Sequence, residues 1–277
     1  MILTYINWDI NPEIVNVFGF SLRYYGLLFV CGLILCGYIL HRIFIKEQIP
    51  IENLQKLTIY AVIGIFAGAR LGHCLFYEPE YYLNHLLEMF LPIQQKAGGG
   101  YIFTGYQGLA SHGGTIGLII AIVAYTISTK EKIVKTLDLI AIVAPLGGCF
   151  IRFANLMNSE IIGTPTNKSW GFIFARVDFL PRHPAQLYEA LSYLLIFGLI
   201  YYLYFSKHVR IGNGLFFGLS LVLIFTARFV IEFVKERQVE FEETMKFDMG
   251  QLLSLPFILI GIVFIFYGLT KNKKYCT

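Results

Sequence analysis

Charged residues are scarce in this sequence. Only 14% of its 277 residues are Asp, Glu, Lys or Arg, whereas 56% are hydrophobic and the mean hydropathy is +0.64. Soluble proteins carry about 25% charged residues, so the composition argues against a soluble multidomain enzyme. The net charge of +4 is modest and does not indicate nucleic-acid binding, so no nucleic-acid partner is expected.

Cysteine is also scarce, with five residues. Four of them fall in apolar segments, where a cysteine behaves as a small hydrophobic residue. These four are Cys31, Cys36, Cys74 and Cys149, and Cys276 stands alone near the end of the sequence. We therefore predict neither a disulfide framework nor a metal site, and nothing in the sequence requires a cofactor.

Several familiar signatures are missing. No H-E-x-x-H motif of a membrane metalloprotease and no G-x-S-x-G nucleophile elbow occurs. No Lys or Arg precedes Arg23, so the first residues lack the charged start of a cleavable signal peptide. We expect them to form an uncleaved outer segment.

Long apolar runs are what the sequence has instead. A run of about twenty apolar residues is long enough to cross a bilayer as a helix. Seven such spans are expected, at 18–40, 57–77, 109–128, 137–157, 186–206, 212–233 and 250–270. The chain is therefore predicted to be an all-α integral membrane protein, with residues 1–277 in a single polytopic membrane domain.

The positions of Lys and Arg predict the orientation, because short cytoplasmic loops carry an excess of them. With the N-terminus outside and the C-terminus cytoplasmic, the cytoplasmic segments hold eleven basic residues and the longer outer segments hold seven. The outer segments lie near 78–108, 158–185 and 234–249. The first of these is amphipathic enough to lie along the membrane interface.

Four arginines fall inside the apolar runs: Arg23, Arg70, Arg152 and Arg228. An arginine at the centre of a membrane helix costs about 2.5–3.5 kcal/mol on insertion scales, so it usually faces a protein interior, a cavity or an anionic partner. The predicted topology places all four in the outer half of the bilayer. Snorkelling to the headgroups is the alternative, and for Arg23 the two explanations are equally good.

Other polar residues gather at the same depth. Arg152, Asn155 and Asn158 are spaced three apart and form a polar patch on one side of the fourth span, with Glu160 at its mouth. In the sixth span, Arg228 and Glu232 lie at i and i+4 on one helix face. These two residues could form an internal ion pair, but the other three arginines would remain in surplus.

The third span opens with SHGGTIG. Gly113 and Gly117 form a G-x-x-x-G pair, which most often indicates close helix packing. His112 is either a polar residue at a helix start or a candidate general base. Before the fifth span, Pro184 suits a first helical turn, and Glu189 follows early in the helix.

Read in order, seven sequence blocks resemble the motifs of bacterial phosphatidylglycerol:prolipoprotein diacylglyceryl transferases. The blocks are RYYGL, GARLGHCLFY, HGGTIG, RFANLMNSEIIG, HPAQLYEA, RFVIEF and MGQLLSLP, and they cover nearly the whole chain. Three positions depart from the family pattern. Ile151 and Ala154 replace glycines beside Arg152, and Ile224 stands where a tyrosine is often found.

The resemblance implies an enzyme of the bacterial inner membrane whose active site faces the outer leaflet. It would transfer the sn-1,2-diacylglyceryl group of phosphatidylglycerol to the lipobox cysteine of a prolipoprotein, and release glycerol 1-phosphate. Its partners would be phosphatidylglycerol, the prolipoprotein lipobox peptide and membrane lipids. An anion transporter and a noncatalytic phospholipid-binding protein are the alternatives, although the apolar cytoplasmic halves of the spans disfavour a transport pathway.

We expect Arg152 and Arg228 to bind the phosphate, because the guanidinium group binds phosphate oxygens bidentately. His112 is the candidate base, while Glu160 and Glu232 are expected to orient the arginines. The expected catalytic residues are His112, Arg152 and Arg228, and the expected substrate-binding residues are Tyr25, Arg70, Asn155, Asn158, Glu160, Gly163, Gln186, Tyr188 and Glu232.

Overall fold

The computed structural model describes residues 5–17, 20–96, 98–104, 108–206, 209–237 and 247–273. Cys276 lies outside the described residues. The elements in chain order are β1 (Ile6–Trp8), β2 (Glu13–Val17), β3 (Phe20–Arg23), α1 (Tyr24–Lys46), α2 (Ile51–Phe76), α3 (Pro79–Asn84), α4 (Leu86–Phe90), β4 (Ile93–Gln95), β5 (Tyr101–Phe103), α5 (Ser111–Thr129), α6 (Ile133–Asn158), β6 (Phe172–Phe174), β7 (Pro181–Arg182), α7 (Ala185–Phe205), α8 (Leu215–Glu232) and α9 (Met249–Lys273).

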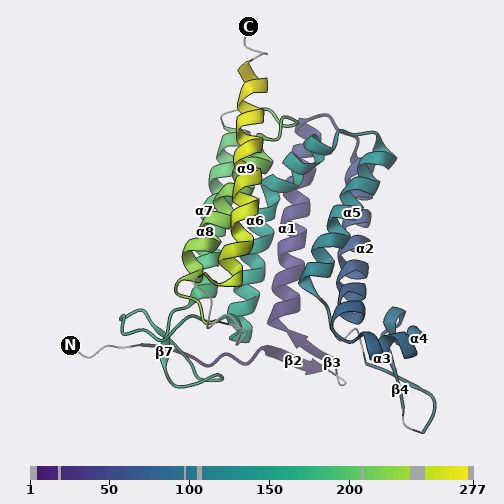
Figure 1. The fold of residues 1–277 in the computed structure, drawn as a ribbon, viewed down its shortest axis with the longest axis vertical. Helices are drawn as coiled ribbons and strands as arrows, with labels where there is room; N and C mark the ends of the chain where they lie inside the picture. Colours follow the sequence, from purple (N-terminus) through teal and green to yellow (C-terminus); the bar gives the residue numbers. More distant parts are fainter. Residues whose placement is uncertain are drawn as a thin grey trace. The chain divides into compact units, whose positions relative to one another are not determined.

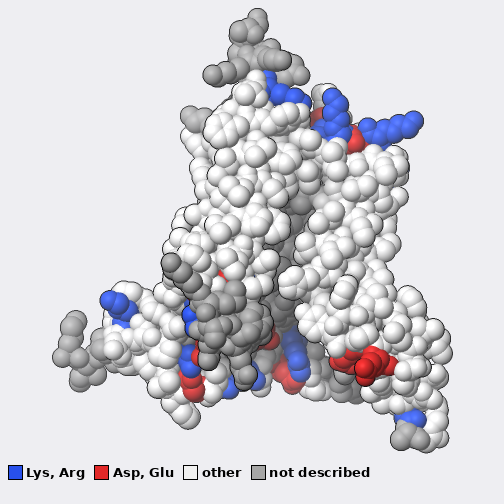
Figure 2. Space-filling view, viewed as in Figure 1, with Lys and Arg blue, Asp and Glu red and all other residues white. Residues whose placement is uncertain are grey.

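Seven of the helices, α1, α2 and α5 to α9, are long and apolar enough to cross a membrane. They coincide with the seven predicted spans, so the prediction of an all-α integral membrane protein is confirmed. On the face shown in Figure 2, the charged side chains gather near the ends of the helices and the surface between them is uncharged.

The first span differs from the prediction at its start. Helix α1 begins at Tyr24, and Arg23 is the last residue of β3, which pairs antiparallel with β2. The Arg23 side chain is 61% exposed, and its Nη2 lies 3.1 Å from Oε1 of Glu13. The prediction that Arg23 lies within a membrane helix is therefore wrong. The apolar run that includes Phe20 and Leu22 belongs to the hairpin, and apolar content alone does not separate such a strand from a helix.

The chain divides into two compact units, which are described separately. The large unit comprises Met1–Ile43 and Leu137–Thr277, and the small unit comprises Phe44–Thr136.

In the small unit, α2 and α5 pack closely along glycine-lined faces (Figure 1). A Cβ atom built on Gly117 would lie 1.9 Å from the carbonyl oxygen of Gly64, and one built on Gly113 would lie 2.3 Å from that of Gly68. The backbones can approach this closely only because neither residue has a side chain. The packing role predicted for the Gly113 and Gly117 pair is confirmed.

Between α2 and α5, the small unit carries the short helices α3 and α4 and the antiparallel β4–β5 hairpin. Ile93 pairs with Phe103 in this hairpin, and Gln95 pairs with Tyr101. Glu88 in α4 is 3% exposed, and it accepts hydrogen bonds from the Tyr81 hydroxyl (2.7 Å) and the backbone N–H of Gln95 (2.8 Å).

The large unit contains α1 and α6 to α9 (Figure 1). Helices α8 and α9 pack against each other at Gly218 and Gly261. A Cβ atom built on Gly218 would lie 2.6 Å from the carbonyl oxygen of Gly261. At one end of α6, the buried carboxylate of Asp138 accepts hydrogen bonds from the backbone at the start of α8. At the other end of α6 the chain forms a three-stranded sheet in the order β1-β6-β7.

Candidate active site

Arg152 lies near the end of α6, surrounded by polar side chains of the large unit. Its Nε atom lies 2.7 Å from Oε2 of Glu189 in α7, and its Nη1 donates a hydrogen bond to Oδ1 of Asn155 (3.2 Å). Asn155 and Asn158 each donate to the carboxylate of Glu160, at 3.2 Å and 3.1 Å. The predicted polar patch of α6 is therefore a continuous network that runs from a partly buried guanidinium to an exposed carboxylate.

Glu189 joins this network, although its position in the sequence indicated only a helix start. Its side chain is 0% exposed, and its carboxylate oxygens have no aligned hydrogen-bond donor among the described residues. The adjacent positive charge of Arg152 therefore compensates its burial. Tyr193, one turn further along α7, interacts electrostatically with Glu189, Arg152 and Arg228. Both arginines expected to bind phosphate thus act electrostatically on the same tyrosine, and Arg152 is in direct contact with the buried carboxylate of Glu189.

Arg228 lies half-buried in α8. Within the described ranges it makes no ion pair, because Glu232 binds Lys235 through Nζ at 3.1 and 3.2 Å. The Glu232 carboxylate is also packed against Gly250 of α9, where a Cβ atom would lie 2.5 Å from Cδ of Glu232. Lys235 is therefore the ion-pair partner of Glu232, and the orientation of Arg228 by Glu232 stays a prediction. The helix spacing of Arg228 and Glu232 could not reveal this competition.

Two amide side chains near Arg152 have unused hydrogen-bonding capacity. Gln186, in the first turn of α7, is 0% exposed, and neither its Oε1 nor its Nε2 has a hydrogen-bond partner among the described residues. Oδ1 of Asn158 is likewise buried without one. Buried polar groups are nearly always hydrogen-bonded, so each exception requires an explanation. Groups of this kind are suited to a polar ligand.

Aromatic residues border the same network. Tyr25, at the start of α1, interacts electrostatically with Glu160 and Arg152. The Tyr188 hydroxyl accepts a hydrogen bond from Nε1 of Trp170 (2.9 Å) and shares another with Nδ1 of His183 (3.1 Å). Burial, together with the positive charge of Lys168, lowers the pKa of His183 below its ordinary value. The imidazole of His183 is thus favoured in its neutral form.

Gly163 holds the extramembrane loops of the large unit together. Its backbone N–H donates to the carbonyl of His183 (2.9 Å), and its carbonyl accepts from Nη1 of Arg182 (3.2 Å). A Cβ atom at this position would lie 2.6 Å from the carbonyl oxygen of Val234, so only glycine fits without displacement. Hydrogen bonds from Arg182 also hold the pKa of Asp178 below its ordinary value. These contacts give Gly163 a scaffolding role beside the network.

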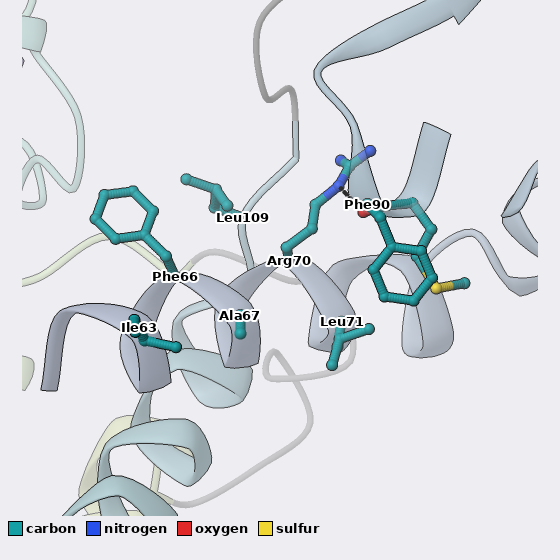
Figure 3. Close-up of a pocket in the computed structure, with 8 residues that line it drawn as sticks. Ile63, Phe66, Ala67, Arg70, Leu71, Phe90 and Leu109 are labelled. Carbon is teal, nitrogen blue, oxygen red and sulfur yellow. Dashed lines mark hydrogen bonds between the residues drawn. The ribbon is translucent and has the colours of Figure 1, made fainter. Parts of the chain in front are cut away.

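Arg70 belongs to the small unit, where it is buried. Its Nε donates to the carbonyl of Met89 (3.1 Å), and its Nη2 donates to the carbonyl of Glu88. Its Cζ atom lies 4.7 Å from the ring centroid of Tyr82. Figure 3 shows this side chain extending from α2 toward Phe90, beside a largely apolar cavity of about 470 Å³. The guanidinium thereby anchors α4 to α2.

His112 lies in the first turn of α5, also in the small unit, and its side chain is exposed. Within the described part of the chain, no group of three or more His, Cys, Asp or Glu residues could hold a metal ion.

Comparisons with known proteins give a consistent result. Residues 12–267 match the family model described as prolipoprotein diacylglyceryl transferase. Curated proteins named phosphatidylglycerol--prolipoprotein diacylglyceryl transferase are similar over nearly their whole length. The protein from Bacteroides fragilis is 52% identical, with 99% of each chain covered. The protein from Tolumonas auensis is 44% identical (96% of this chain and 99% of the relative), and that from Chloroherpeton thalassium is 42% identical (98% and 97%). The chain belongs to the prolipoprotein diacylglyceryl transferase family.

Proposed function

We propose that this protein catalyses the reaction for which its family is named. It transfers the sn-1,2-diacylglyceryl group of phosphatidylglycerol to the lipobox cysteine thiol of a prolipoprotein, which is the first step of lipoprotein maturation. The observation that supports this most directly is the polar cluster of the large unit. This cluster contains Arg152, Arg228 and Gln186, whose amide has no hydrogen-bond partner among the described residues. Two guanidinium groups and a free amide are suited to binding a phosphodiester headgroup.

In this reaction the cysteine sulfur forms a bond to the glyceryl carbon, and the bond between that carbon and the phosphate oxygen breaks. The electron pair stays on the oxygen, so the phosphodiester monoanion becomes a phosphate monoester with additional negative charge. Arg152 and Arg228 stabilise this charge as it develops, which lowers the barrier more than it stabilises the bound substrate. Asn155, Asn158 and Gln186 complete the headgroup site.

The thiol must lose its proton to become a good nucleophile. A free cysteine has a pKa of about 8.5, so most of it is protonated at neutral pH. His112 is the proposed base, because an imidazole titrates close to neutral pH. The pH dependence of kcat/KM for His112→Gln tests this role. Loss of a titration step near neutrality supports the base, whereas an unchanged profile contradicts it.

The remaining site residues have supporting roles in the proposal. Tyr25 and Tyr188 line the headgroup pocket, and Glu160 orients Arg152 through Asn155. Gly163 and Glu232 hold the surrounding segments of the large unit in place, and Arg70 holds α4 against α2 within the small unit. The chain acts as one polytopic domain of the inner membrane, and the active site faces the outer leaflet.

The transfer itself can be tested with purified protein, phosphatidylglycerol and a synthetic lipobox peptide. Mass spectrometry should detect the diacylglyceryl group on the peptide cysteine, together with an equivalent amount of glycerol 1-phosphate. A peptide with serine in place of the cysteine is the matched control. Binding of the lipid without any mass gain would instead indicate the noncatalytic alternative.

A further inference from the structure

A fully buried carboxylate beside a phosphate site is unfavourable for anion binding in general. Oε2 of Glu189 lies 2.7 Å from Nε of Arg152, so an anion bound by that guanidinium also experiences repulsion from Glu189. Such repulsion is strong where water is excluded, because the effective dielectric constant is low. Without Glu189, the site would bind any phosphate more tightly.

The charges around this position can be counted from the contacts. Arg152, which is partly buried, and Glu189, which is fully buried, form an ion pair whose charges cancel. Arg228 adds one positive charge, with no ion pair to any described residue, while Lys235 and Glu232 cancel each other. Glu160 is exposed at the mouth of the network, where water and salt screen its charge. Without Glu160, these side chains therefore carry a net charge of one positive unit.

This charge matches a phosphodiester, which is a monoanion. A phosphate monoester carries about 1.5 to 2 negative charges at neutral pH, because its second pKa is about 6. The second charge of the monoester would face Glu189, and the buried Lys235 is already paired with Glu232. A phosphate that keeps both of its ester bonds is therefore the preferred ligand.

We infer that Glu189 is a specificity-determining residue that selects a phosphodiester monoanion over a phosphate monoester dianion. The inference rests on the proposed function and extends it in two ways. Glu189 disfavours lipids with a terminal phosphate monoester as donors. It also weakens the binding of glycerol 1-phosphate after the transfer, so that the product leaves and the next lipid binds.

Two soluble ligands that differ by one charge test the inference: glycerol 1-phosphate and its monomethyl ester. Each is titrated as a competitor of phosphatidylglycerol in the transfer assay at a pH where the monoester is a dianion. We expect the wild-type protein to bind the methyl ester about tenfold more tightly or better. Glu189→Gln keeps an oxygen facing Arg152 but removes the charge, so it should bind the dianion more tightly and reduce the preference several-fold.

Two variants serve as controls. Glu80→Gln makes the same chemical change at an exposed carboxylate of α3, outside the arginine network, and should leave the ratio of the two inhibition constants unchanged. Glu189→Asp keeps the charge and should preserve the preference for the methyl ester. A loss of positioning alone would weaken both ligands together and leave their ratio as it is.

The outcomes separate the inference from the proposed function. If neither ligand competes with phosphatidylglycerol in the wild-type protein, the phosphate site itself is wrong. If both compete but the wild-type protein binds them equally, the role of Glu189 is overturned and the phosphate site stands. The same conclusion follows if Glu189→Gln retains the full wild-type preference. If Glu189→Gln does not fold, equal binding of the two ligands by the wild-type protein or by Glu189→Asp still overturns the role of Glu189.

Discussion

Arg23, Arg70 and Arg152 are the same residue type in three different surroundings. Arg23 is largely exposed and pairs with Glu13 on the neighbouring strand. Arg70 is buried, and backbone carbonyl groups accept its hydrogen bonds. Arg152 is partly buried, and it contacts an acidic side chain and Asn155, from which the polar network continues to the exposed Glu160. Position in an apolar run therefore does not identify a functional arginine, whereas the surrounding groups do.

The neutral state of His183 predicts a dependence of stability on pH. Its pKa in the folded protein lies below the ordinary value of 6.5 because of burial and the charge of Lys168. Unfolding then takes up a proton between the folded pKa and 6.5, so stability is full above this window and is lost as the pH falls through it. Thermal unfolding of the wild-type protein and His183→Gln, followed between about pH 5 and pH 8, measures the effect. The wild-type curve should fall more steeply on acidification, and identical slopes would contradict the assignment.

Helices were the elements most readily predicted from the sequence, because a bilayer requires long apolar segments. The hairpin that ends at Arg23 was missed because its apolar residues extend the run of α1. The partner of Arg152 was also missed, since Glu189 lies on another helix, and helix periodicity identifies neighbours only within one helix. A signal was nevertheless present: Glu189 is an acid in an apolar helix, and such a residue needs a cation from elsewhere.

The contact between α2 and α5 predicts a position that tolerates no side chain. Gly117→Ala places a methyl group against the backbone of Gly64 and should lower the free energy of unfolding by about 1–3 kcal/mol through overpacking. Gly37→Ala in α1 is the matched control, because its Cβ meets no atom within 4 Å. That variant should be neutral or slightly more stable, since alanine favours helices. Chemical denaturation in detergent measures both, and equal stability of the two variants would refute the close packing.

The carboxylate of Asp138 is predicted to stabilise the loop that leads into α8. Its Oδ2 accepts hydrogen bonds from the backbone N–H groups of Gly212 (2.7 Å) and Gly214 (2.9 Å), and its Oδ1 accepts one from Phe217 (2.9 Å). Asp138→Asn replaces one acceptor oxygen with a donor, so it should cost about 1.5–3 kcal/mol for each lost bond to a charged group. Asp9→Asn, at an exposed position, should change the unfolding free energy little. A similar effect of both substitutions would show that the carboxylate does not hold this loop.

At the scale of the whole molecule, the prediction with the widest consequences concerns orientation in the membrane. The excess of Lys and Arg predicts that the segment containing Val177 faces outward and the loop containing Lys132 faces the cytoplasm. Both residues are exposed, so cysteines introduced there should be accessible to labelling. Val177→Cys should react with a membrane-impermeant maleimide in intact cells, whereas Lys132→Cys should react only after permeabilisation. The reverse pattern would invert the topology and move the arginine cluster to the other leaflet.

The central claim is that Arg152 and Arg228 bind and stabilise the phosphate of the donor lipid. The most direct test is the kcat/KM of lipobox-peptide transfer by Arg152→Lys and Arg228→Lys, measured in purified protein supplied with phosphatidylglycerol. Lysine keeps the charge but loses the planar fork of the guanidinium, so each variant should lose about a hundredfold or more. Arg23→Lys, on the exposed hairpin, should transfer at the wild-type rate. Normal kcat/KM in both cluster variants would contradict the claim.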